Sequence, residues 1–251
     1  QKYYIRFLAE TGIINGNNEI MTRWAPGLSA RPLLQTFASV KYYLSKNELN
    51  DFIKSSYRPF CVSGDVMAFQ NKYFLPLGFT YDRVISLSDY KELTGLKKDM
   101  VLLKAFVAED GEEGLQDFDV YNTNNLSEDY SIAEYGEDIN KLKQEAMVLT
   151  EHSQNSIKGT IQVSDKKLLF FSIPYDEGWT IRIDGEKARK KMANIGFMGV
   201  VVPAGIHEIQ LSFRPPFIVS GTLIMVLSFV LYVLFFLKRK IITDIIKKRT
   251  N

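Results

Sequence analysis

Two aromatic side chains in the segment 175–179 are the residues whose types best suit binding chemistry. The flat ring faces of tyrosine and tryptophan can stack on a sugar ring, so Tyr175 and Trp179 are candidate sugar-contact residues. Trp179 also falls in phase with Ile181 and Ile183 in an alternating pattern, which favours a place in a hydrophobic core. The sequence leaves both interpretations open, with the core as the default.

The same segment holds two adjacent carboxylates, Asp176 and Glu177, which could do acid–base work if they converged. Neighbouring side chains of an extended chain point apart, so a turn is the better interpretation. His152 and His207 are the only histidines and Cys61 is the only cysteine, too few for a zinc site. The chain has no GxGxxG, Walker, GxSxG or HExxH motif. We therefore expect no catalytic residue, metal ion or cofactor in it.

Six acidic residues lie between positions 109 and 119. Carboxylates at set offsets would indicate a calcium loop, but these do not have the spacing of an EF-hand. A solvated acidic loop is the preferred interpretation.

The longest element that the sequence predicts is an uncharged run of 21 residues, 217–237. A helix rises ~1.5 Å per residue, so the run spans roughly 31 Å, close to the ~30 Å hydrocarbon core of a bilayer. Helical geometry also satisfies the backbone polar groups within the segment, as lipid requires. A buried core helix rarely runs this long without a polar face, so we expect a transmembrane helix.

Basic residues follow this run at once. The tail 238–251 contains one acid, Asp244, and six basic residues, namely Lys238, Arg239, Lys240, Lys247, Lys248 and Arg249. Its expected partner is the anionic surface of a lipid bilayer, on which it would lie as an amphipathic helix unless it is a disordered basic segment. Residues 1–237 hold 25 of the 31 basic and 28 of the 29 acidic residues, a net charge of −3. Because this part of the chain has no excess of basic residues, we expect no nucleic-acid partner.

The positive-inside rule predicts a cytoplasmic C-terminus and an extracellular location for residues 1–216. Exported animal domains of this size usually carry disulfides, whereas the single cysteine permits none within the chain. The expected location is therefore a bacterial cell membrane. The chain starts at Gln1 without a leader, so we expect that a signal peptide has been removed or that a membrane-spanning part lies upstream.

Period-2 alternation dominates the segment before the apolar run. Ile209, Leu211 and Phe213 alternate with polar residues, and Asp184-Gly185 is typical of a tight hairpin turn. Such short strands and turns predict a β-sandwich. The expected fold class is α+β, with a mixed α/β extracellular region (1–145), a membrane-proximal β-sandwich (146–216), one C-terminal transmembrane helix (217–237) and a basic cytoplasmic tail (238–251).

Two stretches resemble one protein family. Residues 71–82 read NKYFLPLGFTYD, and residues 174–216 contain GWTIRIDG and GIHEIQLSF. Together with SVKYYL at 39–44 and the apolar run that follows, they resemble the YfhO family of bacterial multi-pass membrane proteins. The resemblance implies the C-terminal extracellular domain and last transmembrane helix of a longer protein.

Members of that family look like GT-C-type glycosyltransferases, which take a sugar from a polyprenyl-phosphate carrier at the outer membrane face. The resemblance implies glycosylation of teichoic or lipoteichoic acid, with the catalytic carboxylate outside this stretch of chain. On this hypothesis residues 1–216 are an accessory acceptor-binding or scaffold module. The alternative is a non-enzymatic, membrane-anchored module that binds a cell-wall glycopolymer or a partner protein.

Overall fold

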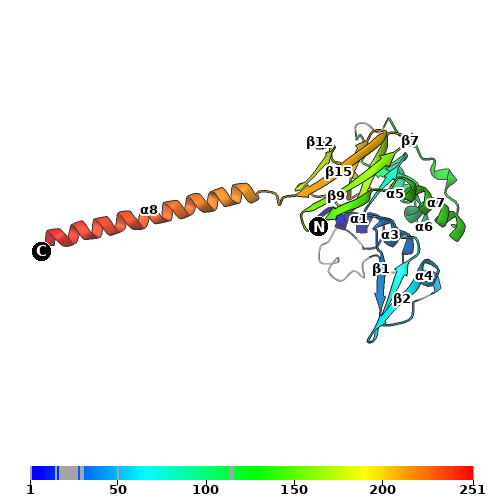
Figure 1. Cartoon of the computed structure of the whole chain (residues 1–251), viewed down its shortest axis with the longest axis horizontal. Helices are drawn as coiled ribbons and strands as arrows, with labels where there is room; N and C mark the ends of the chain where they lie inside the picture. Colours follow the sequence, from blue (N-terminus) through cyan, green and yellow to red (C-terminus); the bar gives the residue numbers. More distant parts are fainter. Residues whose placement is uncertain are drawn as a thin grey trace. The chain divides into compact units, whose positions relative to one another are not determined.

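The computed structural model describes residues 2–14, 16, 28, 31–49, 51–112 and 116–250, with the backbone alone for residue 52 and residues 240–250. The chain divides into two units, Gln1–Ser212 and Phe213–Asn251. The first unit holds three β-sheets and several short helices, and the second holds one long helix (Figure 1).

The described helices of the first unit are short; α1 and α3 precede the first strand, and the others lie between strands along the chain. Ser86 and Ser131 accept hydrogen bonds from the backbone of Asp89 and Glu134, so α5 and α7 begin at serine caps. These helices are α1 (Lys2–Glu10), α3 (Pro32–Phe37), α4 (Asp51–Ser56), α5 (Leu87–Glu92), α6 (Leu96–Val101), the 3-10 helix η1 (Thr123–Asn125) and α7 (Ile132–Gln144).

The three sheets have different orders of strands. The three-stranded sheet has the order β1 (Tyr42–Ser45), β3 (Val66–Asn71), β2 (Tyr57–Ser63). The seven-stranded sheet has the order β4 (Gly78–Tyr81), β10 (Lys167–Pro174), β14 (Phe197–Val202), β13 (Lys191–Ala193), β6 (Phe106–Ala108), β5 (Arg83–Ser86), β7 (Asp119–Val120). The five-stranded sheet has the order β12 (Glu186–Ala188), β11 (Trp179–Ile183), β15 (Gly205–Phe213), β9 (Ser156–Val163), β8 (Val148–His152).

The seven-stranded sheet is the middle layer of the first unit. On β10, Leu168 and Phe170 belong to the hydrophobic cluster formed with the helices, whereas Leu169 and Phe171 belong to the cluster formed with the five-stranded sheet. Both faces of β10 are therefore buried, and its sequence is apolar without interruption from Leu168 to Phe171. Helices rather than water cover the face of β10 that lies opposite Leu169 and Phe171.

The five- and seven-stranded sheets pack face to face. Ile157, Ile161 and Val163 of β9 and Ile209 and Leu211 of β15 are buried in the cluster that these sheets share. The expected fold class is confirmed: helices and sheets are mixed, two sheets form a sandwich, and an apolar helix ends the chain.

The seven-stranded sheet takes strands from both sides of residue 145. β4 pairs with β10, and β6 pairs with β13, each antiparallel. Strands from residues 1–145 and from residues 146–212 thus share one sheet within the first unit. The predicted boundary at residue 145 stays a prediction.

The three-stranded sheet forms a lobe with α4. One face of this sheet packs on α4 through a separate small cluster of buried residues, Leu49, Ile53, Tyr57 and Phe69. Figure 1 shows β1, β2 and α4 together at one end of the first unit. We call these strands the β1–β3–β2 sheet below.

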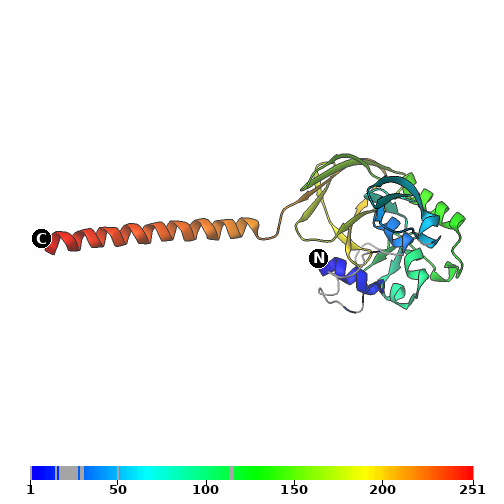
Figure 2. The ribbon, with the colours of Figure 1, turned by 90° about the horizontal axis from the view of Figure 1, so that it is seen from below.

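The second unit is dominated by α8 (Ile218–Thr250), which Figure 2 shows as one continuous helix. Its part Ile218–Arg239 is long and apolar enough to cross a membrane, with a mean hydropathy of 2.5. The expected helix over 217–237 is therefore present, and the backbone stays helical through the basic tail to Thr250. The position of that tail on a bilayer stays a prediction.

Candidate functional site

The predicted sugar-contact residues Tyr175 and Trp179 line one shallow pocket. It has a volume of about 290 Å³ and lies where β10 ends and β11 begins. We call it the aromatic pocket; its lining residues are Tyr175, Glu177, Trp179, Thr180, Ile181, Lys187, Ala188, Arg189 and Lys190. Both aromatic rings are half-buried and pack against the sandwich cluster, so each is partly in the core and partly at the pocket.

Lys190 holds the loop of the aromatic pocket together. Its Nζ lies 4.5 Å from the centroid of the Tyr175 ring, donates to the carbonyl oxygen of Trp179 at 2.8 Å and also donates to that of Asp176. Burial lowers the pKa of Lys190, while the nearby carboxylates of Asp176 and Glu177 oppose that shift. Lys190 therefore acts as a structural cation that contacts the Tyr175 ring and the backbone of Asp176 and Trp179.

The adjacent carboxylates Asp176 and Glu177 do not form an acid–base pair. Oδ1 of Asp176 accepts a hydrogen bond from the backbone N–H of Gly178 at 2.7 Å, which closes a turn ahead of β11. Glu177 is exposed at the pocket rim. The turn interpretation is therefore confirmed.

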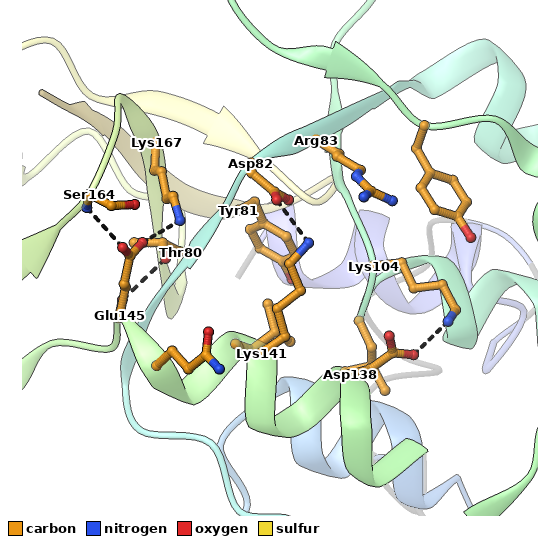
Figure 3. A pocket seen from close by; sticks show the side chains of 14 residues that line it. Thr80, Tyr81, Asp82, Arg83, Lys104, Asp138, Lys141, Glu145, Ser164 and Lys167 are labelled. Atoms are coloured by element: carbon orange, nitrogen blue, oxygen red, sulfur yellow. Dashed lines mark hydrogen bonds and ion pairs between the residues drawn. The ribbon is translucent and has the colours of Figure 1, made fainter. Parts of the chain in front are cut away.

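A second pocket, which we call the charged pocket, lies beside α7 and the edge strand β4 of the seven-stranded sheet (Figure 3). It has a volume of about 220 Å³. Its lining residues are Thr80, Tyr81, Asp82, Arg83, Leu103, Lys104, Tyr121, Asp138, Lys141, Leu142, Gln144, Glu145, Ser164 and Lys167. They come from segments that are far apart in the sequence.

Lys104 is the most buried cation of this pocket. Its Nζ lies 2.6 Å from Oδ2 of Asp138 and 2.9 Å from Oε1 of Glu134, and its side chain is only 11% exposed. Burial opposes its charge, yet these carboxylates raise the pKa of Lys104 above its ordinary value. The hydroxyl of Tyr130 donates to the same Asp138 oxygen at 2.5 Å, and burial raises the pKa of Tyr130 strongly.

The other two carboxylates of the charged pocket are also paired. Asp82 Oδ2 lies 2.8 Å from Nζ of Lys141, and Glu145 is paired with Lys167. Oε1 of Glu145 also accepts from the backbone N–H of Ser164 at 2.8 Å. Each carboxylate that lines the pocket accepts from a lysine, so these ion pairs tie α7 and its C-terminal end to β10 and to the segments next to β4 and β6.

Sequence reasoning did not identify the charged pocket. A signal was present in α7 and at the residue that follows it: Glu134, Asp138, Lys141 and Glu145 recur at intervals of four, three and four residues. Such spacing places charged side chains on one face of a helix. Their partners Asp82 and Lys104 are not marked by any local pattern.

The predicted basic residues of the tail lie at the end of α8. Lys238 and Arg239 are exposed on this helix. The side chains of Lys240, Lys247, Lys248 and Arg249 lie outside the described part of the structure. Of the acids at 109–119, Glu109 pairs with Arg6 at 2.8 Å and Glu112 with Lys191 at 2.8 Å, while Glu113 lies outside the described residues. Within the part of the chain that is described, no group of three or more metal-ligating side chains occurs.

A mixed α/β unit followed by a helix long and apolar enough to span a bilayer is the pattern of a membrane protein. Residues 127–225 match the family described as bacterial membrane protein YfhO. Over 88 residues the chain is 28% identical to the uncharacterised protein YfhO of Bacillus subtilis (strain 168). These matches confirm, over residues 127–225, the resemblance to the YfhO family that the motifs predict.

The extent of these matches is limited. The stretch shared with the Bacillus subtilis protein covers 35% of this chain and 10% of that relative. The family match includes the GWTIRIDG and GIHEIQLSF motifs and both aromatic pocket residues, whereas residues 71–82 lie ahead of it. No solved structure matches the chain.

Proposed function

We propose that this chain is the C-terminal extracellular part of a GT-C-type glycosyltransferase. The whole enzyme would transfer a sugar from a polyprenyl-phosphate carrier to teichoic or lipoteichoic acid at the outer face of a bacterial membrane. The observation that carries the proposal is that Tyr175 and Trp179 line one pocket inside the segment that matches the YfhO family.

The chemistry of the aromatic pocket suits an acceptor polymer. Two aromatic rings offer faces for sugar or glycerol carbons, and Lys187 and Arg189 supply positive charge at the rim. Teichoic acids are phosphodiester polymers with hydroxyl groups, so both kinds of contact are complementary to them. The pocket is shallow, which fits a long chain passing over it better than an enclosed small molecule.

The catalytic carboxylate of the enzyme is proposed to lie in another part of the protein. The carboxylates lining the charged pocket are engaged by lysines, and Asp176 is engaged in a turn. This distribution supports an accessory role for residues 1–216, either binding the acceptor or acting as a scaffold.

The orientation is proposed from the charges that flank α8. The basic residues after residue 237 favour a cytoplasmic tail and an extracellular first unit. A membrane-impermeant maleimide tests this in intact cells that carry the full-length protein with single cysteines. In a Cys61→Ser background, Asp51→Cys on α4 should be labelled and Thr250→Cys should not. The reverse result contradicts the orientation and the extracellular role with it.

The acceptor-binding role is tested by the sugar content of the extracted polymer. Cells with the full-length protein carrying Tyr175→Ala and Lys187→Ala should make less glycosylated polymer at an unchanged level of membrane-inserted protein. Lys158→Ala is the matched control, because Lys158 lies on β9 of the same five-stranded sheet and outside the aromatic pocket. Unaltered glycosylation in the double variant would contradict acceptor binding at this pocket.

The second candidate is a non-enzymatic, membrane-anchored module that binds a cell-wall glycopolymer or a partner protein. The engaged carboxylates favour it, because binding needs no acid–base pair. The two candidates differ in one result: deletion of the whole protein abolishes polymer glycosylation if it is the transferase and leaves it intact if it is only a binding module.

A further inference from the structure

One face of the β1–β3–β2 sheet is open to solvent although it carries large apolar side chains. Phe60 is 56% exposed, Leu44 is 67% exposed and Tyr42 is 42% exposed. The rings of Tyr42 and Phe60 contact each other, with centroids 5.0 Å apart. The opposite face of the sheet packs on α4 through Tyr57 and Phe69, while Val62, at the far end of that face, is 70% exposed.

The strand register shows that these side chains share a face. Tyr42 pairs with Gln70 and Leu44 with Ala68, two residues apart on β1 and on β3. Successive even positions of a strand lie on one face. A bulge between Pro59 and Cys61 in β2 places Phe60 beside Tyr42, and Cys61 pairs with Ala68 on the same face. The open face is defined here by Tyr42, Leu44, Phe60, Cys61, Ala68 and Gln70.

The charges around the open face are positive. The sequences of β1, β2 and β3 contain no aspartate or glutamate. Arg58 lies across from Gln70 and donates to its Oε1 at 2.8 Å, and Nζ of Lys41 lies 5.5 Å from the centroid of the Tyr42 ring. The acid of the adjoining turn, Asp65, is paired with Lys46 at 2.8 Å.

We propose that the open face of the β1–β3–β2 sheet docks on the surface of the lipid bilayer. Apolar and aromatic side chains bordered by cations are the composition of interfacial membrane surfaces, where rings enter the headgroup region and cations meet anionic lipid. The first unit is joined to the candidate membrane-spanning helix through residues 213–217, so a bilayer is always nearby at high effective concentration. This inference rests on the membrane span and not on the proposed transferase activity.

Charge complementarity selects lipid over a second copy of the chain. Two copies meeting through this face would bring two positively charged patches together, because an isologous interface uses the same patch on both copies. Anionic headgroups meet those cations with opposite charge. A cell-wall polymer would match the cations and leave the exposed apolar area of Leu44 and Phe60 in water.

The single cysteine supplies the probe. The full chain is labelled on Cys61 with an environment-sensitive fluorophore and placed in vesicles of anionic and zwitterionic lipid, with or without nitroxide-labelled lipid. Docking predicts a blue-shifted emission that the nitroxide lipid quenches. Neutralising Lys41 or Arg58 should weaken docking about fivefold per cation in anionic vesicles, and high salt should do the same.

A matched control carries the fluorophore on the other side of the lobe. Asp51→Cys in the Cys61→Ser background places it on α4, where quenching by nitroxide lipid should be weak. The pair Leu44→Asp and Phe60→Ser should abolish quenching at Cys61 without unfolding, because both side chains are exposed. A blue shift without lipid quenching would show that protein covers the face, and equal quenching at both labels or none at Cys61 would also overturn the proposal.

Discussion

Asp184 and His207 are joined by a hydrogen bond of 2.7 Å between Oδ2 of the carboxylate and Nδ1 of the ring. Nε2 of the same ring lies 3.1 Å from the carbonyl oxygen of Pro203. Both ring nitrogens thus face acceptors, an arrangement that the doubly protonated imidazolium satisfies. Oδ1 of Asp184 accepts from the backbone N–H of Glu208 at 2.8 Å, so this pair fastens the turn after β11 to the start of β15.

The first prediction concerns the pH dependence of stability. The hydrogen bond with Asp184 raises the pKa of His207, and the bond with His207 lowers the pKa of Asp184. An unfolded histidine titrates near ~6.5, so the pair contributes fully below about pH 6.5 and its contribution is lost as the pH rises through the higher folded pKa. In acid the contribution is lost as the pH falls through the lowered pKa of Asp184.

Thermal unfolding of the full chain in detergent, followed from weakly acidic to alkaline pH, measures this effect. His207→Gln should remove the loss of stability above neutral pH. His152→Gln is the control, because His152 is exposed on β8. If the two variants show the same pH profile, the pairing of His207 with Asp184 does not contribute to stability.

The second prediction concerns Gly196, which lies beside α1. A Cβ added at Gly196 would lie 2.1 Å from the carbonyl oxygen of Tyr3, a distance that backbone atoms cannot tolerate. Gly196→Ala should therefore destabilise the chain by about 3 kcal/mol, at the upper end of the cost of overpacking. Chemical denaturation of the full chain in detergent measures the difference.

The matched control is the same substitution in α7. A Cβ at Gly136 would meet only the Tyr73 ring, at an ordinary contact distance of 3.8 Å. Gly136→Ala should stabilise the chain by up to ~1 kcal/mol, because alanine favours a helix over glycine. Equal effects of the two substitutions would show that the close approach of α1 to Gly196 does not constrain the fold.

Local features of the fold could be predicted from the sequence. The Asp184-Gly185 signal predicts a hairpin, and the structure has φ of 51° and 84° at these residues between β11 and β12, as a type I′ turn requires. The apolar run predicts the apolar part of α8, because length and composition are enough to identify a candidate membrane span. Turns and long apolar helices are set by adjacent residues, so one sequence is enough to identify them.

Long-range pairings could not be predicted in this way. Nothing near Asp82 indicates that it meets Lys141, 59 residues later, or that β4 pairs with β10. The Asp184–His207 hydrogen bond likewise joins the GWTIRIDG and GIHEIQLSF motifs. The glycines and apolar residues of these motifs have local roles in turns and strands. The role of His207 depends on a partner that is distant in the sequence. The candidate aromatic residues were identified from their types, but their shared pocket depends on how Lys190 folds the loop.

The third prediction concerns the buried cation of the charged pocket. Lys104→Met leaves Asp138 and Glu134 without their ammonium partner in a partly buried place. The free energy of unfolding should fall by about 3 kcal/mol, the low end for breaking a buried ion pair, because solvent still reaches both carboxylates. Denaturation measured on Lys104→Met, Asp138→Leu and the double variant forms a double-mutant cycle. Additive losses would show that the two side chains are not coupled.

The fourth prediction concerns Trp179, whose ring is shared between the core and the aromatic pocket. The ring is half-buried in the sandwich cluster, so Trp179→Ala should lower stability by about 2 kcal/mol, less than the ~3–5 kcal/mol of a fully buried aromatic residue. Thermal or chemical unfolding measures this loss. Unchanged stability would exclude the packing role.

The exposed part of the same ring can be examined separately, since the chain has two tryptophans and Trp24→Phe leaves Trp179 as the sole one. Adding a teichoic acid polymer to this variant should then change the Trp179 emission if the ring stacks on the polymer. Lys187→Ala in the same background should weaken polymer binding about fivefold. This is the loss in affinity expected when one lysine is removed next to an anionic surface. A change in emission that persists at full strength without Lys187 would assign the contact to the rings alone, and no change in either variant would leave Trp179 with its packing role only.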